Sequence, residues 1–286
     1  MTRAMRSEAL SIALKPGVDA RAAVAQLRDQ VALARNLASG AHGQGPDSLR
    51  TLRDSYLSWC DVTERHLRGR LQDRRVTDEI LNERYWRIRS IEGDSPRPHE
   101  VINRELERQA DDLERLAESI EQRRIRLSDP PGTVACLDTH VLLHGLAVDQ
   151  IIWTDVLDAE TARLVLPLRV VEELDDKKSA RNEKLADRAR RVLAQLDRLF
   201  ADRPGPVFLR EATTLEVLVE LDDEHFSKAD HEILACCEDL ERYTGSAPLL
   251  VTTDSAMRLR ARARGLQVVK LPKKYRPLDD VTSEES

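Results

Sequence analysis

The stretch Thr133–Leu143, TVACLDTHVLL, decides how the region around it is expected to fold. A short apolar run ends on one acid, Asp138, and a second apolar run follows it. The first run favours a strand and Thr139 is suited to cap a helix, so Asp138 is predicted where a buried strand ends and a helix begins. Open α/β sheets bind their ligands at that edge. Aspartate is also an ordinary capping residue, so Asp138 alone indicates no function.

The sequence after residue 132 alternates strand-like runs with helical ones. The predicted strands are 134–137, 163–166, 207–210, 213–221, 249–252 and 266–270. The helical runs between them include 228–242 and 255–264, the latter closed by Gly265. Alternation of this kind is typical of a three-layer α/β fold with a mainly parallel sheet, which we expect over residues 133–272.

The sequence before this region is helical in pattern, and residues 128–132, SDPPG, mark the boundary. Helices are predicted at 18–37, from 47 or 48 onward, between Thr77 and Ile91, and at 99–127. Along the last of these, an apolar residue recurs every seven positions, at Leu106, Leu113, Ile120 and Leu127. This repeat suits an all-α bundle or coiled-coil hairpin over residues 1–128. It fits packing within the chain and between chains, so a homo-oligomer through this half stays open.

The composition is that of a soluble protein with a polar surface. The 286 residues are 41% hydrophobic and 34% charged, and their number favours two domains. Residues 1–130 carry 23 Lys and Arg against 22 Asp and Glu, so the net charge of −6 belongs to the second half. Four cysteines without CxxC spacing and no long apolar segment lead us to expect a cytoplasmic protein without membrane contact. Residues 273–286, basic and then acidic, are expected to be a disordered tail.

Three further acids stand at places comparable to that of Asp138. Asp254 directly follows the strand LLVTT, and Asp230 lies in the first turn of its helix. Glu173 follows the second strand, beside the apolar stripe of its helix, whereas Glu172 points further towards solvent. If the strands are parallel, all four acids converge on one edge of the sheet.

Converging carboxylates repel one another, so such a cluster usually implies a hard divalent cation. Oxygen ligands suit Mg²⁺ or Mn²⁺ rather than zinc, and no HExxH or Cys/His cluster competes. A metal held in this way can activate water and stabilise the charge that develops on a phosphodiester. The residues therefore predict metal-dependent phosphodiester hydrolysis.

Four segments together resemble the acidic blocks of PIN domains, in the expected order. They are LDTHVLL, VLPLRVVEELDDKK, SKADHEILACC and LLVTTDSAMRLRARARGLQVV. The resemblance implies a PIN fold over about 133–272, with Mg²⁺ or Mn²⁺ bound by Asp138, Glu173, Asp230 and Asp254, and a nuclease usually directed at RNA. Thr252 matches the hydroxyl residue that often supports such a site. His140 stands where asparagine is more common.

Basic residues beside the acids offer contacts for a nucleic acid. Lys177, Lys178 and Arg181 follow Glu173 and are suited to receive substrate phosphates, although a solvated face explains them equally well. The leading hypothesis is an endoribonuclease acting on single-stranded RNA or structured loops. The alternative is a catalytically silent RNA-binding or assembly module whose helical half mediates oligomerisation. A protein inhibitor is not indicated, and the sequence does not name the RNA target.

Overall fold

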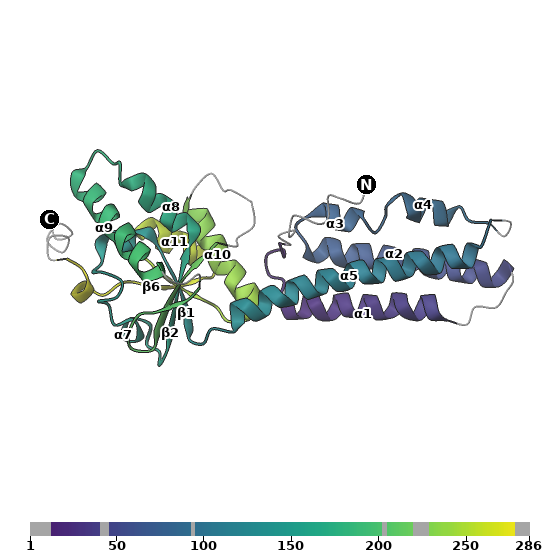
Figure 1. Cartoon of the computed structure of the whole chain (residues 1–286), viewed down its shortest axis with the longest axis horizontal. Coiled ribbons are helices and arrows are strands. Elements are labelled where there is room, and N and C mark those ends of the chain that lie inside the picture. The colour runs from purple at the N-terminus through teal and green to yellow at the C-terminus, as the bar shows by residue number, and fades with distance from the viewer. Residues whose placement is uncertain (1–12, 41–45, 93–94, 202–204, 220–228, 278–286) are drawn as a thin grey trace. The chain divides into compact units, whose positions relative to one another are not determined.

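The computed structural model describes residues 13–40, 46–92, 95–201, 205–219 and 229–277. The chain divides into two compact units, Met1–Arg126 and Leu127–Ser286, shown in Figure 1. The fold class predicted from the sequence is confirmed: helices come first, and a mainly parallel sheet with helices follows. None of the helices formed by the described residues is both long and apolar enough to cross a membrane.

The first unit is built from helices. They are α1 (Ala20–Ser39), α2 (Pro46–Arg70), α3 (Arg74–Asp78), α4 (Glu83–Arg89) and α5 (Pro98–Ser128). The three long helices run side by side, and α3 and α4 pack on α2 (Figure 1). Leu106, Leu113 and Ile120 of the seven-residue repeat are buried, so the repeat forms part of this unit's own core.

The segment between α2 and α5 differs from its prediction. From the sequence, Thr77 is one candidate to cap a helix here and the number of helices stays open, but in the structure Thr77 lies inside α3 and is buried. The side chains of Asp73 and Asn82 instead accept backbone N–H bonds and begin α3 and α4. Because the cap at Asn82 starts a new helix nine residues after Asp73, the segment forms two short helices instead of one.

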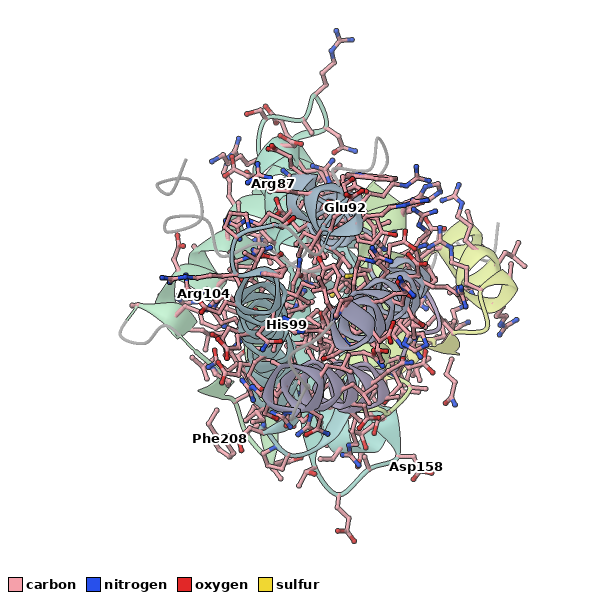
Figure 2. All side chains as sticks on the ribbon, turned by 90° about the vertical axis from the view of Figure 1, so that its right-hand side faces the viewer. Arg87, Glu92, His99, Arg104, Asp158 and Phe208 are labelled. Atoms are coloured by element: carbon pink, nitrogen blue, oxygen red, sulfur yellow. The ribbon has the colours of Figure 1, made fainter. Side chains whose placement is uncertain are left out.

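Most arginines of this unit lie on its surface and pair with nearby acids. Arg68 pairs with Glu64 and Arg87 with Glu83, each one helical turn away. Arg104, 77% exposed, projects into solvent from α5 (Figure 2). Arginines paired in this way are typical of a solvated helix surface.

The second unit contains a six-stranded sheet and its helices. The strands are β1 (Thr133–Leu137), β2 (Ala162–Pro167), β3 (Val207–Phe208), β4 (Thr213–Leu218), β5 (Leu249–Val251) and β6 (Gln267–Val269). The helices are α6 (Thr139–His144), α7 (Trp153–Leu157), α8 (Leu168–Lys177), α9 (Glu183–Phe200), α10 (Ala229–Thr244), α11 (Ser255–Ala263) and the 3-10 helix η1 (Lys273–Tyr275).

The strand order is β3-β4-β2-β1-β5-β6, and every neighbouring pair is parallel except β3 with β4. β3 is only two residues long and forms one edge, where Phe208 points outward (Figure 2). The central strands are buried on both faces, because β1, β2 and β5 are almost wholly apolar. The carboxyl ends of β1, β2 and β5 therefore meet at one edge of the sheet.

Two further predictions concern the end of the chain. Gly265 has φ +80° and follows the last residues of α11, where its backbone lets the chain turn into β6. The expectation of disorder from residue 273 is wrong for the first residues of that segment, because Lys273–Tyr275 form η1 and Tyr275 is buried. The amide of Leu146 donates to the Tyr275 carbonyl, which attaches η1 to the unit. Residues 278–286 lie outside the described residues.

Candidate active site

Asp138 lies at the carboxyl end of β1, in the centre of the sheet. Its amide donates to the Val251 carbonyl at 3.1 Å, so the pairing of β1 with β5 extends one residue further. Its side chain is only 4% exposed and makes no capping bond to α6. The sequence therefore puts a buried carboxylate directly after the last residue of a central strand.

Thr252 connects Asp138 to the next acid. Its hydroxyl donates to Asp138 Oδ2 at 2.5 Å and accepts the amide N–H of Asp254 at 3.0 Å. Thr252 is fully buried, so this hydroxyl cannot find water instead. One side chain thus orients the first acid and fixes the backbone of the second.

Asp254 caps α11 with one oxygen and faces the site with the other. Oδ1 accepts the amides of Ala256 at 2.6 Å and Met257 at 3.1 Å. Oδ2 lies 3.7 Å from Nε2 of His140, which stands in the first turn of α6. His140 therefore belongs to the acid cluster rather than to its periphery.

Glu173 reaches the same edge from α8. Its Oε2 accepts the hydroxyl of Thr139, the residue after Asp138, and its Oε1 lies 3.9 Å from Nζ of Lys177. The Glu173 side chain is 20% exposed, whereas Glu172 is 44% exposed and pairs with Arg169. Thr139 had been expected to cap α6, but it is the first residue of that helix and binds Glu173.

Asp230 makes a different contact from the other three acids. It lies in the first turn of α10, as predicted, and its carboxylate forms an ion pair with Arg260 on α11. The two residues are 30 positions apart, and nothing in their local sequence signals the pair. The structure thus brings Asp138, Glu173 and Asp254 together through threonine hydroxyls, while Asp230 is held by an arginine.

The electrostatics of Asp138 follow from this arrangement. Burial raises the pKa of the Asp138 carboxyl above its ordinary value, and the carboxylates of Glu173 and Asp254 raise it further. The Thr252 hydroxyl and His140 act in the opposite direction and lower that pKa. The surrounding protein groups therefore compensate the negative charge of the Asp138 carboxylate only in part. Incomplete compensation of this kind is common at functional sites.

Comparison with known proteins agrees with this geometry. The family model described as "PIN domain" matches residues 135–272, which span the four acids. Residues 135–272 form a PIN domain.

The chain is also similar to a solved structure described as "A domain of a functionally unknown protein from Methanocaldococcus jannaschii DSM 2661". The match has 17% sequence identity, covers 49% of this chain and 91% of that chain, and has a TM-score of 0.32. No curated protein matches the chain.

The donor set of the PIN domain fits a hard divalent cation. Asp138, Glu173 and Asp254 supply only carboxylate oxygens, and PIN domains generally use divalent metals. Within the described ranges, however, no three His, Cys, Asp or Glu side chains already stand around a single point as ligands would. Glu173 accepts the Thr139 hydroxyl, and Asp230 is paired with Arg260.

The three predicted nucleic-acid contacts, Lys177, Lys178 and Arg181, have different surroundings. Lys177 is next to Glu173 and 32% exposed, whereas Lys178 donates to Asp175 at 2.5 Å. Arg181 is exposed beyond the end of α8. Only Lys177 is therefore placed beside the acid cluster itself.

Sequence reasoning missed His144 and Arg188 near this site. His144 lies four residues after His140, and this spacing puts both rings on one face of α6. That spacing was the available signal. Arg188 comes from α9, 44 residues further along the chain, and had no comparable signal.

Proposed function

We propose that the PIN domain is a metal-dependent endoribonuclease that hydrolyses RNA phosphodiester bonds. The supporting observation is Asp138, a carboxylate 4% exposed whose side chain is held by one threonine hydroxyl. Its neighbours at the sheet edge include two further carboxylates. An uncompensated group of this kind is costly to the fold unless it binds a cation.

Each side chain has a distinct task in this proposal. Asp138 and Asp254 hold Mg²⁺ or Mn²⁺, with Thr252 keeping the Asp138 carboxylate in one orientation. Glu173 supports the ion or its water, and Asp230 completes the set when it leaves Arg260. When bound, Mg²⁺ or Mn²⁺ would lower the pKa of a water molecule and offset negative charge on the phosphodiester.

The products are those that the resemblance to PIN nucleases implies. The oxygen of water bonds to phosphorus, the bond to the 3′ oxygen breaks, and that oxygen takes up a proton released by the water, which leaves a 5′-phosphate and a 3′-hydroxyl. Lys177 is placed to receive a substrate phosphate, and Lys178 and Arg181 extend the same basic segment. We expect the reaction in the cytoplasm on single-stranded RNA or loops, with residues 1–128 contributing RNA contacts or oligomerisation.

Cleavage of a mixed RNA pool in Mn²⁺ or in EDTA tests the activity. We expect new 5′-phosphate ends in Mn²⁺ and none in EDTA. Asp138→Asn should lower the cleavage rate at least about 100-fold, the usual effect of removing one group that stabilises charge in the transition state. Unchanged cleavage by Asp138→Asn would refute the assignment.

The neighbouring glutamates supply a matched control. Glu173→Gln should lose cleavage, while Glu172→Gln should keep it, since Glu172 is turned to Arg169 and solvent. Both substitutions remove one charge from the same helix. Equal losses would point to a general effect of charge on RNA affinity.

The alternative is a catalytically silent RNA-binding or assembly module. The ion pair between Asp230 and Arg260 favours it, because an arginine can satisfy an acid that a metal would otherwise need. This alternative predicts RNA binding without metal and no turnover at any Mg²⁺ or Mn²⁺ concentration. Asp230→Asn separates the two functions: it lowers the cleavage rate of a nuclease and leaves metal-independent RNA binding intact.

A further inference from the structure

Arg258 carries a positive charge beside Asp254. Its amide N–H donates to the Asp254 carbonyl at 3.1 Å, so Arg258 stands one turn after Asp254 on α11. Its Nη1 donates to the Thr253 carbonyl at 2.8 Å, and its Nη2 donates to Ser255 Oγ at 2.9 Å. The guanidinium therefore lies against the two residues that flank Asp254 in the chain.

The charge of Arg258 is not compensated by an acid. Both of its acceptors are neutral, and among the described residues no carboxylate forms an ion pair with it. Two arginines further along the chain differ, because Arg260 pairs with Asp230 and Arg264 lies 3.4 Å from Glu238. A guanidinium has five N–H groups, so Arg258 keeps three for a ligand. Its side chain is partly exposed, and a ligand can reach it.

The place of Arg258 in α11 is not explained by the stability of that helix. Helical side chains lean towards the N-terminus, and the bond to Thr253 shows that this one reaches back beyond the first helical residue. The N-terminus is the positive end of the helix dipole, where a cation is unfavourable. A bound anion would offset this disadvantage.

Two cations come from the helices that follow the strands on either side of β1. The strand order places β1, with Asp138 at its end, between β2 and β5. Lys177 belongs to α8, the helix after β2, and lies beside Glu173. Arg258 belongs to α11, the helix after β5, and lies beside Asp254. Since neighbouring strands are about 4.8 Å apart, β2 and β5 are separated by about 10 Å.

An RNA strand needs cations on both sides of an acid cluster. The carboxylates attract a metal but repel every phosphate other than the one that the metal holds. The phosphates before and after the scissile one must therefore be held by positive side chains. A guanidinium suits this task, because its planar fork of N–H groups matches two oxygens of one phosphate.

We propose that Arg258 binds a backbone phosphate of single-stranded RNA on the Asp254 side of the acid cluster. Lys177 binds another phosphate on the Glu173 side, so the strand runs along the edge of the sheet across β2, β1 and β5. The scissile phosphate then lies at Asp138, between the two contacts. This inference rests on the proposed nuclease function and adds to it the path of the substrate.

The test measures RNA affinity rather than turnover. A fluorescein-labelled, unstructured 12-nucleotide RNA is titrated with full-length protein in EDTA, and its anisotropy is followed at several salt concentrations. Arg258→Gln removes the charge and keeps an NH₂ donor. It should weaken binding about 10-fold, as expected for loss of one charged hydrogen-bonded contact. It should also lower the slope of log K against log salt by about 0.7, the value for one single-strand phosphate.

A double variant tests the path of the strand. Lys177→Gln alone should lower the salt slope by about 0.7, and Lys177→Gln combined with Arg258→Gln by about 1.4, because each residue contacts its own phosphate. A double variant that lowers the slope by only about 0.7 means that both residues share one phosphate. The proposed path across the three strands would then be wrong.

Two controls separate a phosphate contact from general charge and from a structural role. Arg264→Gln removes the same charge about 9 Å further along α11, where Glu238 already compensates it, and should bind RNA like the parent. Arg258→Gln should still be stabilised by Mn²⁺ in thermal unfolding. Loss of both RNA affinity and Mn²⁺ stabilisation would mean that Arg258 only positions Asp254, which overturns the inference.

Arg258→Lys provides a second variant at the same position. It keeps the charge without the planar fork, so it should retain the parental salt slope with lower RNA affinity. Thermal unfolding shows whether each variant folds. If Arg258→Gln does not fold, Arg258→Lys carries the test, and parental affinity in Arg258→Lys then overturns the inference.

The outcomes separate this inference from the proposed function. Parental affinity in Arg258→Gln overturns the inference, as does an equal loss in Arg264→Gln or a parent that binds no RNA. A parent that cleaves RNA in Mn²⁺ while Arg258→Gln binds normally leaves the nuclease proposal intact. If the parent binds RNA through Arg258 but never cleaves it, the nuclease proposal fails and the inference stands.

Discussion

Glu105 in the helical unit and Asp138 in the PIN domain are equally buried, at 4% exposure. The charge of Glu105 is compensated by its neighbours, whereas that of Asp138 is not. Glu105 accepts two hydrogen bonds from Arg108, one from Arg84 and one from Gln109. Asp138 accepts one from Thr252 and lies near two carboxylates. Burial alone therefore does not indicate function, whereas burial without compensation does.

The largest expected effect that would distinguish Asp138 from Glu105 is stabilisation of the PIN domain by a bound metal. Mn²⁺ at about 100 times its Kd should raise the free energy of unfolding of the PIN domain by about 2.7 kcal/mol. Calorimetry of the full chain with and without Mn²⁺ measures this. Asp138→Asn should abolish the gain and a Glu105 variant should keep it, so a gain that survives Asp138→Asn places the metal elsewhere.

The second-largest expected effect is the loss of stability when Glu105, whose charge is compensated, is replaced. Glu105→Ala should lower the free energy of unfolding of the helical unit by about 2 kcal/mol, less than for a fully buried pair, because Arg84 and Arg108 stay partly solvated. Urea denaturation followed by circular dichroism gives the value. Glu107→Ala, exposed on the same helix, serves as the control and should change stability by less than about 0.5 kcal/mol. Similar losses in both would remove the distinction.

The smallest expected effect is a gain in stability when Asp138 is replaced, opposite in sign to the loss at Glu105. Asp138→Asn should raise the free energy of unfolding at pH 7 without metal by about 1 kcal/mol, since it removes a poorly compensated buried charge. The folded-state pKa of Asp138 is raised, so its destabilising effect is absent in acid and develops as pH rises through that pKa. Urea titrations at pH 4 and pH 7 should therefore show a smaller gain at pH 4. A loss of stability at pH 7 contradicts this account.

The elements of the chain were largely predictable because their signals are local. Helical spacing marked α5, and short apolar runs marked β1, β2 and β5. The number of helices between α2 and α5 could not be decided from the sequence because several residues could cap: Thr77, Asp73 and Asn82 compete, and the choice depends on which side chain meets free N–H groups.

The site was predictable in its acids but not in their partners. Asp138 and Asp254 could be recognised because Asp138 directly follows β1 and Asp254 lies three residues after the end of β5. The bond from Thr252 to Asp138 joins residues 114 positions apart, and the ion pair of Asp230 joins residues 30 apart. Such contacts depend on how strands and helices pack, and no local pattern contains that information.

The two oxygens of the Asp254 carboxylate have different partners, and this has a consequence for substitution. Its Oδ1 is occupied by two amides of α11, so the group cannot rotate and Oδ2 has a fixed direction. An asparagine at this position would keep its single oxygen on those amides, because its NH₂ group cannot accept them. Its nitrogen would then point where Oδ2 points now. Asp254→Asn would thus replace an electron-pair donor with two N–H groups and reverse the polarity presented to any cation, while the start of α11 stays intact.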